Sequence, residues 1–318
     1  MQSRLSILIL SGCDEAERNE ILSIAPNANV WAESDKEVSS KHLAEAEVIM
    51  GKPTHDQLQD AQKLRWLHLP SAGADGFTDQ SLYHNKDIIV TTSSGVYGMP
   101  IAEHVFALIL SFGRSLPAHF RNQNAKHWHS EAPKRDFFGS TLGIVGLGDI
   151  GHEVAKRGHA FGAKVLAVKR NPTNIPGYIE RLYGEEGIDE VVAHSDYLVL
   201  ALPHTTRTEN MLNRKRIAMM KSSSYLVNIG RGALVDQEAL IEALQEKRIA
   251  GAGLDVTSPE PLPQESPLWK LDNVILTSHS SGRSLSNRRR TQQIFCANLK
   301  RYQNKQSLKN AIDFLAGY

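Results

Sequence analysis

The amino-acid sequence predicts an α/β protein built from two doubly wound parallel-sheet domains. The chain has 318 residues, which is long for a single hydrophobic core and favours two domains. Short apolar runs alternate with helical patterns from the N-terminus onward, as strands and helices do in a parallel α/β sheet. The same alternation begins again at Thr141. Each half of the chain is therefore expected to hold its own sheet.

The first domain is expected to contain five buried strands, because each apolar run is short and bounded by polar or turn-forming residues. These runs are Ser6–Leu10, Val30–Ala32, Val48–Met50, Leu64–Leu69 and Ile88–Thr91. A strongly apolar helix that could cross between the domains follows, with Pro100 at its start and a continuous apolar pattern through Leu110. A domain boundary is expected near residue 100.

The second domain is expected to contain a complete sheet of its own. Its predicted strands are Thr141–Val145, Lys164–Val168, Tyr197–Ala201, Ser224–Ile229, Gly251–Val256 and Val274–Thr277. The chain then reads as one amphipathic helix, Asn287–Asn304, and a tail with Leu308, Ile312 and Phe314. We expect this last helix to return to the first domain. The domains would then be residues 1–100 with 287–318, and residues 101–286.

Composition excludes several classes of protein. Charge is almost balanced, with 36 Lys plus Arg against 35 Asp plus Glu, so neither nucleic-acid binding nor disorder is expected. The run Arg288–Arg290 precedes apolar residues at helical spacing and is interpreted as a solvated helix face.

Cysteine usage and the apolar segments indicate a cytoplasmic protein without metal or membrane span. Cys13 and Cys296 are the only cysteines, far apart, which argues against a disulfide scaffold or a structural zinc and suits a reducing cytosol. His127 and His129 lack a third ligand at usable spacing. The run Leu5–Leu10 is too short for a signal peptide, and no segment is apolar for the roughly 18 residues of a membrane span.

A dinucleotide-binding turn is predicted at Gly146-Leu-Gly148-Asp-Ile-Gly151, between the strand Thr141–Val145 and a helical segment, His152–Phe161. The first glycine permits the tight turn, the second lets the backbone approach a pyrophosphate, and the third lets the helix pack on the strand. Amides at the helix start, including those of Asp149 and Ile150, would face the phosphates.

The residues after the second strand of this domain favour NADP over NAD. An NAD-binding fold places an acidic residue about 20 positions after the glycines, where it binds the ribose 2′-hydroxyl. Here Lys169-Arg170-Asn171 follow Val168 instead. A cationic pair would hold a 2′-phosphate through charge-assisted hydrogen bonds. Plain surface charges at a strand end, with NAD as cofactor, remain the alternative.

Polar residues follow three further predicted strands, at the edge where parallel sheets bind ligands. They are Arg231, Glu260 and His279. An arginine at such an edge can clamp an anion and polarise a carbonyl, a glutamate can orient a histidine, and a histidine can donate a proton. Singly, each has an ordinary structural explanation, but together beside a nucleotide turn they indicate an active site.

With these motifs in place, the chain resembles the D-isomer-specific 2-hydroxyacid dehydrogenase family. The similarity runs from Ser71-Ala-Gly-Ala-Asp75 through Pro100-Ile-Ala-Glu-His104 to His279, and it is most specific at Asn228–Asp236 and Asp255–Pro263. It implies a flavodoxin-like substrate domain, a Rossmann cofactor domain, an active site in the cleft between them, and a homodimer.

The resemblance also assigns residues. It implies Arg231, Glu260 and His279 as the catalytic set. Loop amides at Ala72 and Gly73, which could also form an anion nest, would bind the substrate carboxylate, and Lys52 could line the same site or be a surface lysine. Further cofactor contacts are implied at Leu202, Pro203, Thr208, Ile229, Gly230 and Asp255.

The expected activity is reduction of a small unphosphorylated 2-keto acid, such as glyoxylate or hydroxypyruvate, to the D-2-hydroxy acid with NADPH. Phosphate-recognising relatives place an arginine where this chain has Leu69-Pro70, which disfavours a phosphorylated substrate. Ser278 replaces the proline common before the histidine, and Ser280-Ser281 follow it, which could alter loop geometry or substrate choice. A phosphoglycerate dehydrogenase-like enzyme, a formate or phosphite oxidase, and a nucleotide-sensing corepressor remain alternatives.

Overall fold

The computed structural model describes residues 4–131 and 135–317, and the chain divides into two compact units. One unit comprises Met1–Val96 with Ser284–Tyr318, and the other comprises Tyr97–Arg283. The division falls slightly before the predicted boundaries at residues 100 and 286. Helix α4 (Gly98–Gly113) begins before Pro100, so a boundary at residue 100 would cut its first turn.

The first unit contains a five-stranded parallel sheet in the order β2-β1-β3-β4-β5. This is the strand order of flavodoxin-like folds, as expected. Its strands are β1 (Ser6–Ile9), β2 (Asn29–Ala32), β3 (Val48–Met50), β4 (Trp66–Leu69) and β5 (Ile89–Thr92). Its helices are α1 (Glu15–Ile24), α2 (Ser40–Glu45), α3 (His55–Asp60) and α10 (Asn287–Gln303), with a 3-10 turn η1 (Gln80–Leu82).

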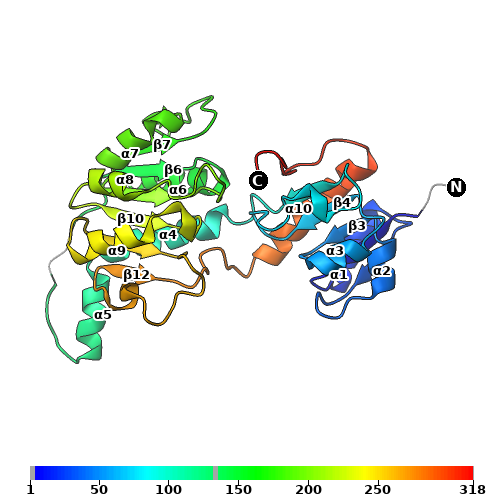
Figure 1. Cartoon of the computed structure of the whole chain (residues 1–318), viewed down its shortest axis with the longest axis horizontal. Helices are drawn as coiled ribbons and strands as arrows, with labels where there is room; N and C mark the ends of the chain where they lie inside the picture. The colour runs from blue at the N-terminus through cyan, green and yellow to red at the C-terminus, as the bar shows by residue number, and fades with distance from the viewer. Residues whose placement is uncertain (1–3, 132–134, 318) are drawn as a thin grey trace. The chain divides into compact units, whose positions relative to one another are not determined.

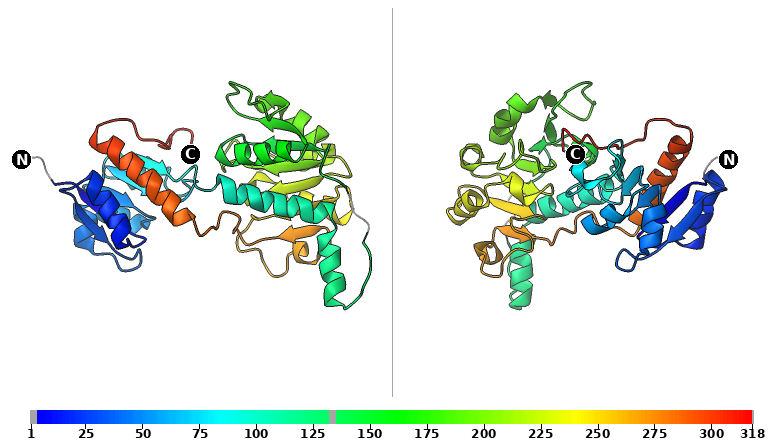
Figure 2. Two further views of the ribbon diagram at one scale, coloured as in Figure 1. Left: turned by 180° about the vertical axis from the view of Figure 1, so that it is seen from behind. Right: turned by 45° about the vertical axis from the view of Figure 1, so that its right-hand side comes forward.

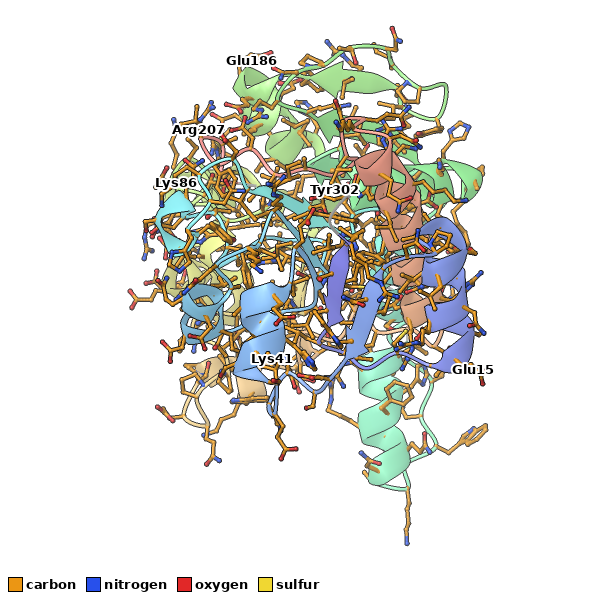
Figure 3. All side chains as sticks on the ribbon, turned by 90° about the vertical axis from the view of Figure 1, so that its right-hand side faces the viewer. Glu15, Lys41, Lys86, Glu186, Arg207 and Tyr302 are labelled. Carbon is orange, nitrogen blue, oxygen red and sulfur yellow. The ribbon has the colours of Figure 1, made fainter. Side chains whose placement is uncertain are left out.

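Helix α10 completes the first unit by packing beside α1, as Figure 2 shows for the orange and blue helices. Phe295 is fully buried and stacks on Trp66 with 5.1 Å between the ring centroids. Tyr302, labelled in Figure 3, also stacks on Trp66 and donates a hydrogen bond to Glu47. The last helix therefore covers a face of the first sheet.

Arg288 and Arg289 are exposed, as predicted for a solvated helix face, but both also form ion pairs. The Arg288 guanidinium donates hydrogen bonds of 2.7 and 2.6 Å to both carboxylate oxygens of Glu17, and Arg289 pairs with Glu20. The hydrogen bond from Arg288 holds the pKa of the Glu17 carboxyl below its ordinary value, against the opposing effect of burial. Two of the arginines thus join α10 to α1, which the linear sequence does not indicate because 271 positions separate Arg288 from Glu17.

The second unit contains a seven-stranded parallel sheet in the order β12-β11-β10-β9-β6-β7-β8. Six of its strands match the predicted segments: β6 (Thr141–Val145), β7 (Lys164–Val168), β9 (Tyr197–Leu200), β10 (Tyr225–Asn228), β11 (Gly251–Leu254) and β12 (Val274–Leu276). The seventh, β8 (Arg181–Tyr183), was not predicted, because it is a three-residue edge strand without a buried apolar run. The strand order reverses between β6 and β9, which is the switch point where doubly wound sheets bind dinucleotides.

Helices cover both faces of this sheet (Figure 1). Helices α4 and α6 (Asp149–Ala160) pack on one face, against Tyr197 and Val199 of β9. Helices α7 (Ile188–His194), α8 (Arg214–Met219) and α9 (Gln237–Gln245) pack on the other, against Leu198 and Leu200. Side chains alternate between the two cores because successive residues of a strand point to opposite faces.

The remaining elements of this unit are short. They are α5 (Leu116–Asn124), η2 (Glu185–Gly187), η3 (Gly232–Leu234) and η4 (Pro267–Lys270). Helix α5 extends away from the rest of its unit in Figures 1 and 2. Among the described residues, no helix is long and apolar enough to cross a membrane.

Candidate active site

The three residues predicted to be catalytic follow three neighbouring strands of the second unit. Arg231 follows β10, Glu260 lies in the loop after β11, and His279 lies after β12. These strands are adjacent and parallel, so all three residues come from the same edge of the sheet. The same edge carries the Gly146–Gly151 turn after β6.

His279 and Glu260 are in direct contact. The Nδ1 atom of His279 lies 2.8 Å from Oε2 of Glu260, while Oε1 of Glu260 accepts a hydrogen bond from the Thr257 amide at 3.1 Å. Because a carboxylate only accepts hydrogen bonds, Nδ1 of His279 is the donor and carries a hydrogen. The other ring nitrogen, Nε2, is left for proton exchange. The side chains are 50% and 37% exposed, so the pair is accessible to a substrate.

The backbone of His279 adopts a left-handed conformation, with φ of 49°. Such a conformation is uncommon for residues other than glycine and persists where the surroundings impose it. The His279 amide donates to the Asp255 carbonyl at 2.8 Å. The amides of Ser280 and Ser281 donate to the Asp255 carboxylate at 2.9 and 3.0 Å.

Asp255 is therefore the anchor of the histidine loop. Asp255 is 1% exposed, and its carboxylate also accepts a hydrogen bond of 2.6 Å from the Thr277 hydroxyl. Burial would raise the pKa of this carboxyl, but the hydrogen bonds from Ser281, Thr277 and Ser280 hold it below its ordinary value. Ser280 reaches Asp255 through its backbone amide, whereas Ser281 reaches it through both its amide and its side chain.

His104 extends this anchor, a role that its motif in the sequence does not indicate. Its Nε2 lies 3.0 Å from the Thr277 hydroxyl oxygen. The Thr277 hydroxyl hydrogen is already donated to Asp255, so His104 donates from Nε2. Helix α4 thereby contacts the end of β12. The position of His104 in Pro100-Ile-Ala-Glu-His104 was the available signal, but its partner lies 173 positions away.

The loop that carries Glu260 is held by a residue that the sequence did not indicate. The side-chain amide of Gln237 donates to the Ser258 carbonyl at 2.6 Å and accepts from the Ser258 amide at 2.9 Å. The same loop passes so close to Gly232 that a Cβ there would lie 1.9 Å from the Thr257 carbonyl oxygen. Both contacts fix the backbone from which Glu260 extends.

Arg231 begins a 3-10 turn, and the Asn228 side chain fixes its backbone. The Asn228 amide donates to the Arg231 carbonyl at 2.9 Å and accepts from the Gly230 amide at 3.1 Å. The guanidinium donates to the Gly230 carbonyl at 2.7 Å. The side chain is partly buried, as a residue that clamps a small anion at the sheet edge should be.

The glycine turn has the geometry that a dinucleotide requires. Gly146 has φ of 108°, and a Cβ there would lie 2.5 Å from the Ala201 carbonyl oxygen; at Gly151 it would lie 2.2 Å from the Gly146 carbonyl oxygen. Around Gly148, which is exposed, there is open space. Helix α6 has no side-chain cap, so its first amides, including those of Asp149 and Ile150, suit a pyrophosphate.

Positive charge gathers where β7 ends. Lys169 follows the strand, its amide donates to the Tyr183 carbonyl at 3.0 Å, and exposed Arg170 comes next. Burial, followed by the ammonium groups of Lys169 and Lys156, lowers the pKa of His152 in the first turn of α6. Lys169 therefore lies near the start of the helix, where the ribose of a dinucleotide would be expected.

The other predicted cofactor residues lie at the same edge of the sheet, and one of them, Thr208, holds a loop there. A Cβ on Gly146 would meet Leu202, and a Cβ on Gly230 would meet the Leu202 carbonyl oxygen at 2.7 Å. Pro203 follows Leu202 in the chain, and Ile229 precedes Gly230. The Thr208 hydroxyl donates to the Pro203 carbonyl at 2.8 Å and accepts from the Thr205 amide at 2.8 Å, so Thr208 holds the loop after β9.

The predicted substrate residues belong to the first unit. Lys52 follows β3 and is exposed, while Ala72 and Gly73 lie in the loop after β4 and are partly buried. Strands β3 and β4 are adjacent and parallel, so these residues come from one edge of their sheet. The Ser71 hydroxyl donates to the Gly73 carbonyl at 2.7 Å and shapes that loop.

Comparison with known proteins points to one family. The family model described as "D-isomer specific 2-hydroxyacid dehydrogenase, NAD binding domain" matches residues 106–281. The chain is 38% identical over 247 residues to a glyoxylate/hydroxypyruvate reductase B of Pectobacterium carotovorum, covering 74% of this chain and 76% of that one. It is also 34% identical over 252 residues to a D-3-phosphoglycerate dehydrogenase of Methanocaldococcus jannaschii, covering 77% of this chain but only 47% of that longer protein.

A solved structure extends the similarity to nearly the whole fold. It is a D-isomer-specific 2-hydroxyacid dehydrogenase from Xanthobacter autotrophicus in complex with NADPH and MES. The TM-score is 0.85 at 28% sequence identity, covering 99% of this chain and 100% of that chain.

Proposed function

Since the chain belongs to the D-isomer-specific 2-hydroxyacid dehydrogenase family of oxidoreductases, we propose that it reduces a small unphosphorylated 2-keto acid to the D-2-hydroxy acid with NADPH. The observation that carries this proposal is the 2.8 Å contact between Nδ1 of His279 and Glu260, at the sheet edge that also holds the glycine turn. The relative named glyoxylate/hydroxypyruvate reductase B supports this substrate class.

A nicotinamide cofactor held at the Gly146–Gly151 turn would supply the hydride that reduces the carbonyl carbon. Negative charge then develops on the carbonyl oxygen, and Nε2 of the His279 imidazolium donates a proton to it. Glu260, bound at Nδ1, fixes the ring and balances its positive charge. In the oxidative direction the neutral His279 accepts the proton from the hydroxyl group.

The substrate carboxylate needs positive or amide partners. Arg231 offers a planar fork of donors that can hold the carboxylate and polarise the carbonyl. We assign the amides of Ala72 and Gly73 to the same carboxylate, because small residues leave the loop backbone accessible. Lys52, exposed after β3, would add a positive charge that attracts the same carboxylate.

The preference for NADPH rests on charge. Residues 169–179, which follow β7, contain no acidic residue to bind a ribose 2′-hydroxyl, whereas Lys169 and Arg170 would pair with a 2′-phosphate. The depressed pKa of His152, caused by burial and then by Lys169, agrees with a positive local potential. The Xanthobacter structure contains NADPH, which supports the same cofactor here.

A second candidate is oxidation of 3-phosphoglycerate, favoured by the similarity to the Methanocaldococcus phosphoglycerate dehydrogenase. Leu69-Pro70 supply no cation where a phosphate would need one, so we rank it second.

We further propose a homodimer. Helix α5 extends from its unit and carries two exposed apolar side chains, Leu116 at 36% and Phe120 at 58%, which a second copy of the chain would cover. Light scattering of the purified protein should give twice the mass of one chain, and Phe120→Asp should lower the measured mass toward that of a single chain. A monomeric wild-type protein would refute this assignment.

The test of the activity is oxidation of NADPH and NADH with glyoxylate, hydroxypyruvate, pyruvate, phenylpyruvate and 3-phosphohydroxypyruvate. We expect turnover of at least one unphosphorylated acid, with NADPH preferred. Lys169→Ala should raise KM for NADPH by about tenfold, the loss expected for one charge-assisted hydrogen bond, and leave KM for NADH unchanged. His204→Ala, exposed after β9, is the control.

Three outcomes would contradict parts of this proposal. Preference for the phosphorylated acid would favour the second candidate. Equal use of both cofactors would refute the role assigned to Lys169 but not the proposed reaction. Nucleotide binding without turnover of any acid would favour a sensing protein over an enzyme.

A further inference from the structure

Four polar side chains lie fully inside the first unit, away from the residues assigned so far. Trp66 and His68 belong to β4, Thr91 belongs to β5, and Ser93 follows β5. Each is 0% exposed. Residue 68 lies opposite residue 91 in the parallel register of the two strands, so the side chains meet inside the core.

Hydrogen bonds link these groups in one chain. The Trp66 Nε1 and the Thr91 hydroxyl oxygen are 2.8 Å apart, and Nδ1 of His68 is 2.8 Å from the same oxygen. On the other side of the ring, Nε2 of His68 is 3.2 Å from the Ser93 hydroxyl oxygen, which lies 2.9 Å from the Leu69 carbonyl oxygen. No polar atom of the four side chains is without a partner.

The ends of the chain determine the direction of every hydrogen bond. The Leu69 carbonyl can only accept, so the Ser93 hydroxyl donates to it and must accept from Nε2 of His68. The indole of Trp66 can only donate, and the Thr91 hydroxyl then donates to Nδ1 of His68. This assignment satisfies all groups with a neutral imidazole that carries its hydrogen on Nε2.

The surroundings of His68 agree with a neutral ring. Burial lowers the pKa of His68 to about 4, so the imidazole is uncharged at neutral pH. Phe295 packs against it with 5.6 Å between the ring centroids. A buried polar chain of this kind rigidifies the core only when every member is satisfied, which is the case here.

The chain ends at the loop that follows β4. Leu69 is the last residue of that strand, and its carbonyl accepts from the Ser93 hydroxyl. The Ser93 amide donates to the Ser71 carbonyl at 2.9 Å, and the Ser71 hydroxyl donates to the Gly73 carbonyl at 2.7 Å. Ser93 thus holds this loop at two points, and His68 holds the Ser93 hydroxyl.

We propose that His68 and Ser93 are positioning residues, which hold the Pro70–Gly73 loop in the geometry that presents the Ala72 and Gly73 amides to the carboxylate of the 2-keto acid. This inference rests on the proposed function for the identity of the ligand. The order of the loop itself does not depend on that function, so it can be measured separately.

The kinetic test uses Ser93→Ala, which removes the hydroxyl but keeps the backbone bond to Ser71. We expect KM for the 2-keto acid to rise by about tenfold, the cost of one lost buried hydrogen bond, with KM for NADPH and kcat nearly unchanged. His68→Leu should have the same effect. His68→Gln can still donate toward Ser93 and should restore KM most of the way.

A matched control separates positioning from stability. Leu67→Val alters a fully buried residue of the same strand, and its side chain points to the opposite face from His68. It should lower the thermal midpoint without changing KM for the 2-keto acid. A rise in KM with Leu67→Val equal to that with Ser93→Ala would overturn the proposal, since general destabilisation would then explain both.

Hydrogen exchange supplies a readout that needs no turnover. The amides of Ala72 and Gly73 should exchange about tenfold faster in Ser93→Ala and His68→Leu than in the wild type or Leu67→Val. Unchanged exchange would overturn the positioning role, and so would faster exchange with an unchanged KM. If no 2-keto acid is turned over, the proposed function fails, and exchange alone decides whether His68 and Ser93 hold the loop.

Discussion

The glycine turn of the second unit offers two substitutions that separate cofactor binding from folding. A Cβ on Gly151 would lie 2.2 Å from the Gly146 carbonyl oxygen and 3.1 Å from its carbon, so the backbone of the turn would have to move. A Cβ on Gly148 meets nothing within 4 Å. The same chemical change, glycine to alanine, therefore meets opposite environments three positions apart.

The magnitudes follow from these contacts. Forcing a methyl group into a packed site costs about 1–3 kcal/mol. For a unit the size of Tyr97–Arg283, a cost near 2 kcal/mol lowers the midpoint of thermal unfolding by roughly 4–8 °C. For Gly148→Ala only the poorer N-cap preference of alanine acts, at less than about 1 kcal/mol or roughly 3 °C.

The assay pairs thermal unfolding, followed by circular dichroism, with a fluorescence titration of NADPH. Both variants should bind NADPH at least about tenfold more weakly, Gly148→Ala because its methyl group enters the space through which the backbone approaches the pyrophosphate. Only Gly151→Ala should unfold much earlier. The reasoning fails if Gly148→Ala binds NADPH as the wild type does, or if it is as unstable as Gly151→Ala.

Three further outcomes are expected. Glu260→Gln should lower kcat by about 10–100-fold in the reductive direction, because the charge beside His279 is lost. The free energy of unfolding measured in urea should change by less than about 1 kcal/mol, since the pair is half exposed. An unchanged kcat would contradict the role of Glu260. Asp255 has a depressed folded-state pKa, so its contribution to stability is present above its unfolded pKa and is lost as pH falls through the folded pKa. Lowering the pH from about 5 to 3 should therefore reduce the free energy of unfolding of Asp255→Asn less than that of the wild type, and equal reductions would refute the anchor. Phe295→Ala, which empties a fully buried site stacked on Trp66, should cost about 3–5 kcal/mol in chemical denaturation; a cost below about 1 kcal/mol would show that α10 contributes little to its unit.

Local patterns were sufficient for most of the fold. Strands such as Lys164–Val168 were predicted to the residue, because a buried strand is a continuous apolar run bounded by turns. Helix starts were less accurate: α6 begins at Asp149, before the predicted His152, since its first turn is occupied by residues of the glycine motif. The edge strand β8 was missed because it lacks an apolar run.

The candidate site divides in the same way. Arg231, Glu260 and His279 could be selected as candidates from the sequence, because each follows a strand and the carboxyl ends of parallel strands share one edge. The residues that hold them could not. His104 and Gln237 act on partners far away in the chain.

The sequence by itself determined the two sheets, the glycine turn, the cationic end of β7 and the residues proposed as the acid–base pair, since these depend on residue type and on spacing within a few turns or strands. Only the tertiary structure decided which groups hold that chemistry in place. The chain from Trp66 through His68 to Ser93 depends on the register of β4 against β5, which brings together residues 25 positions apart. Such pairings are set by packing in three dimensions, and no local pattern of residues encodes them.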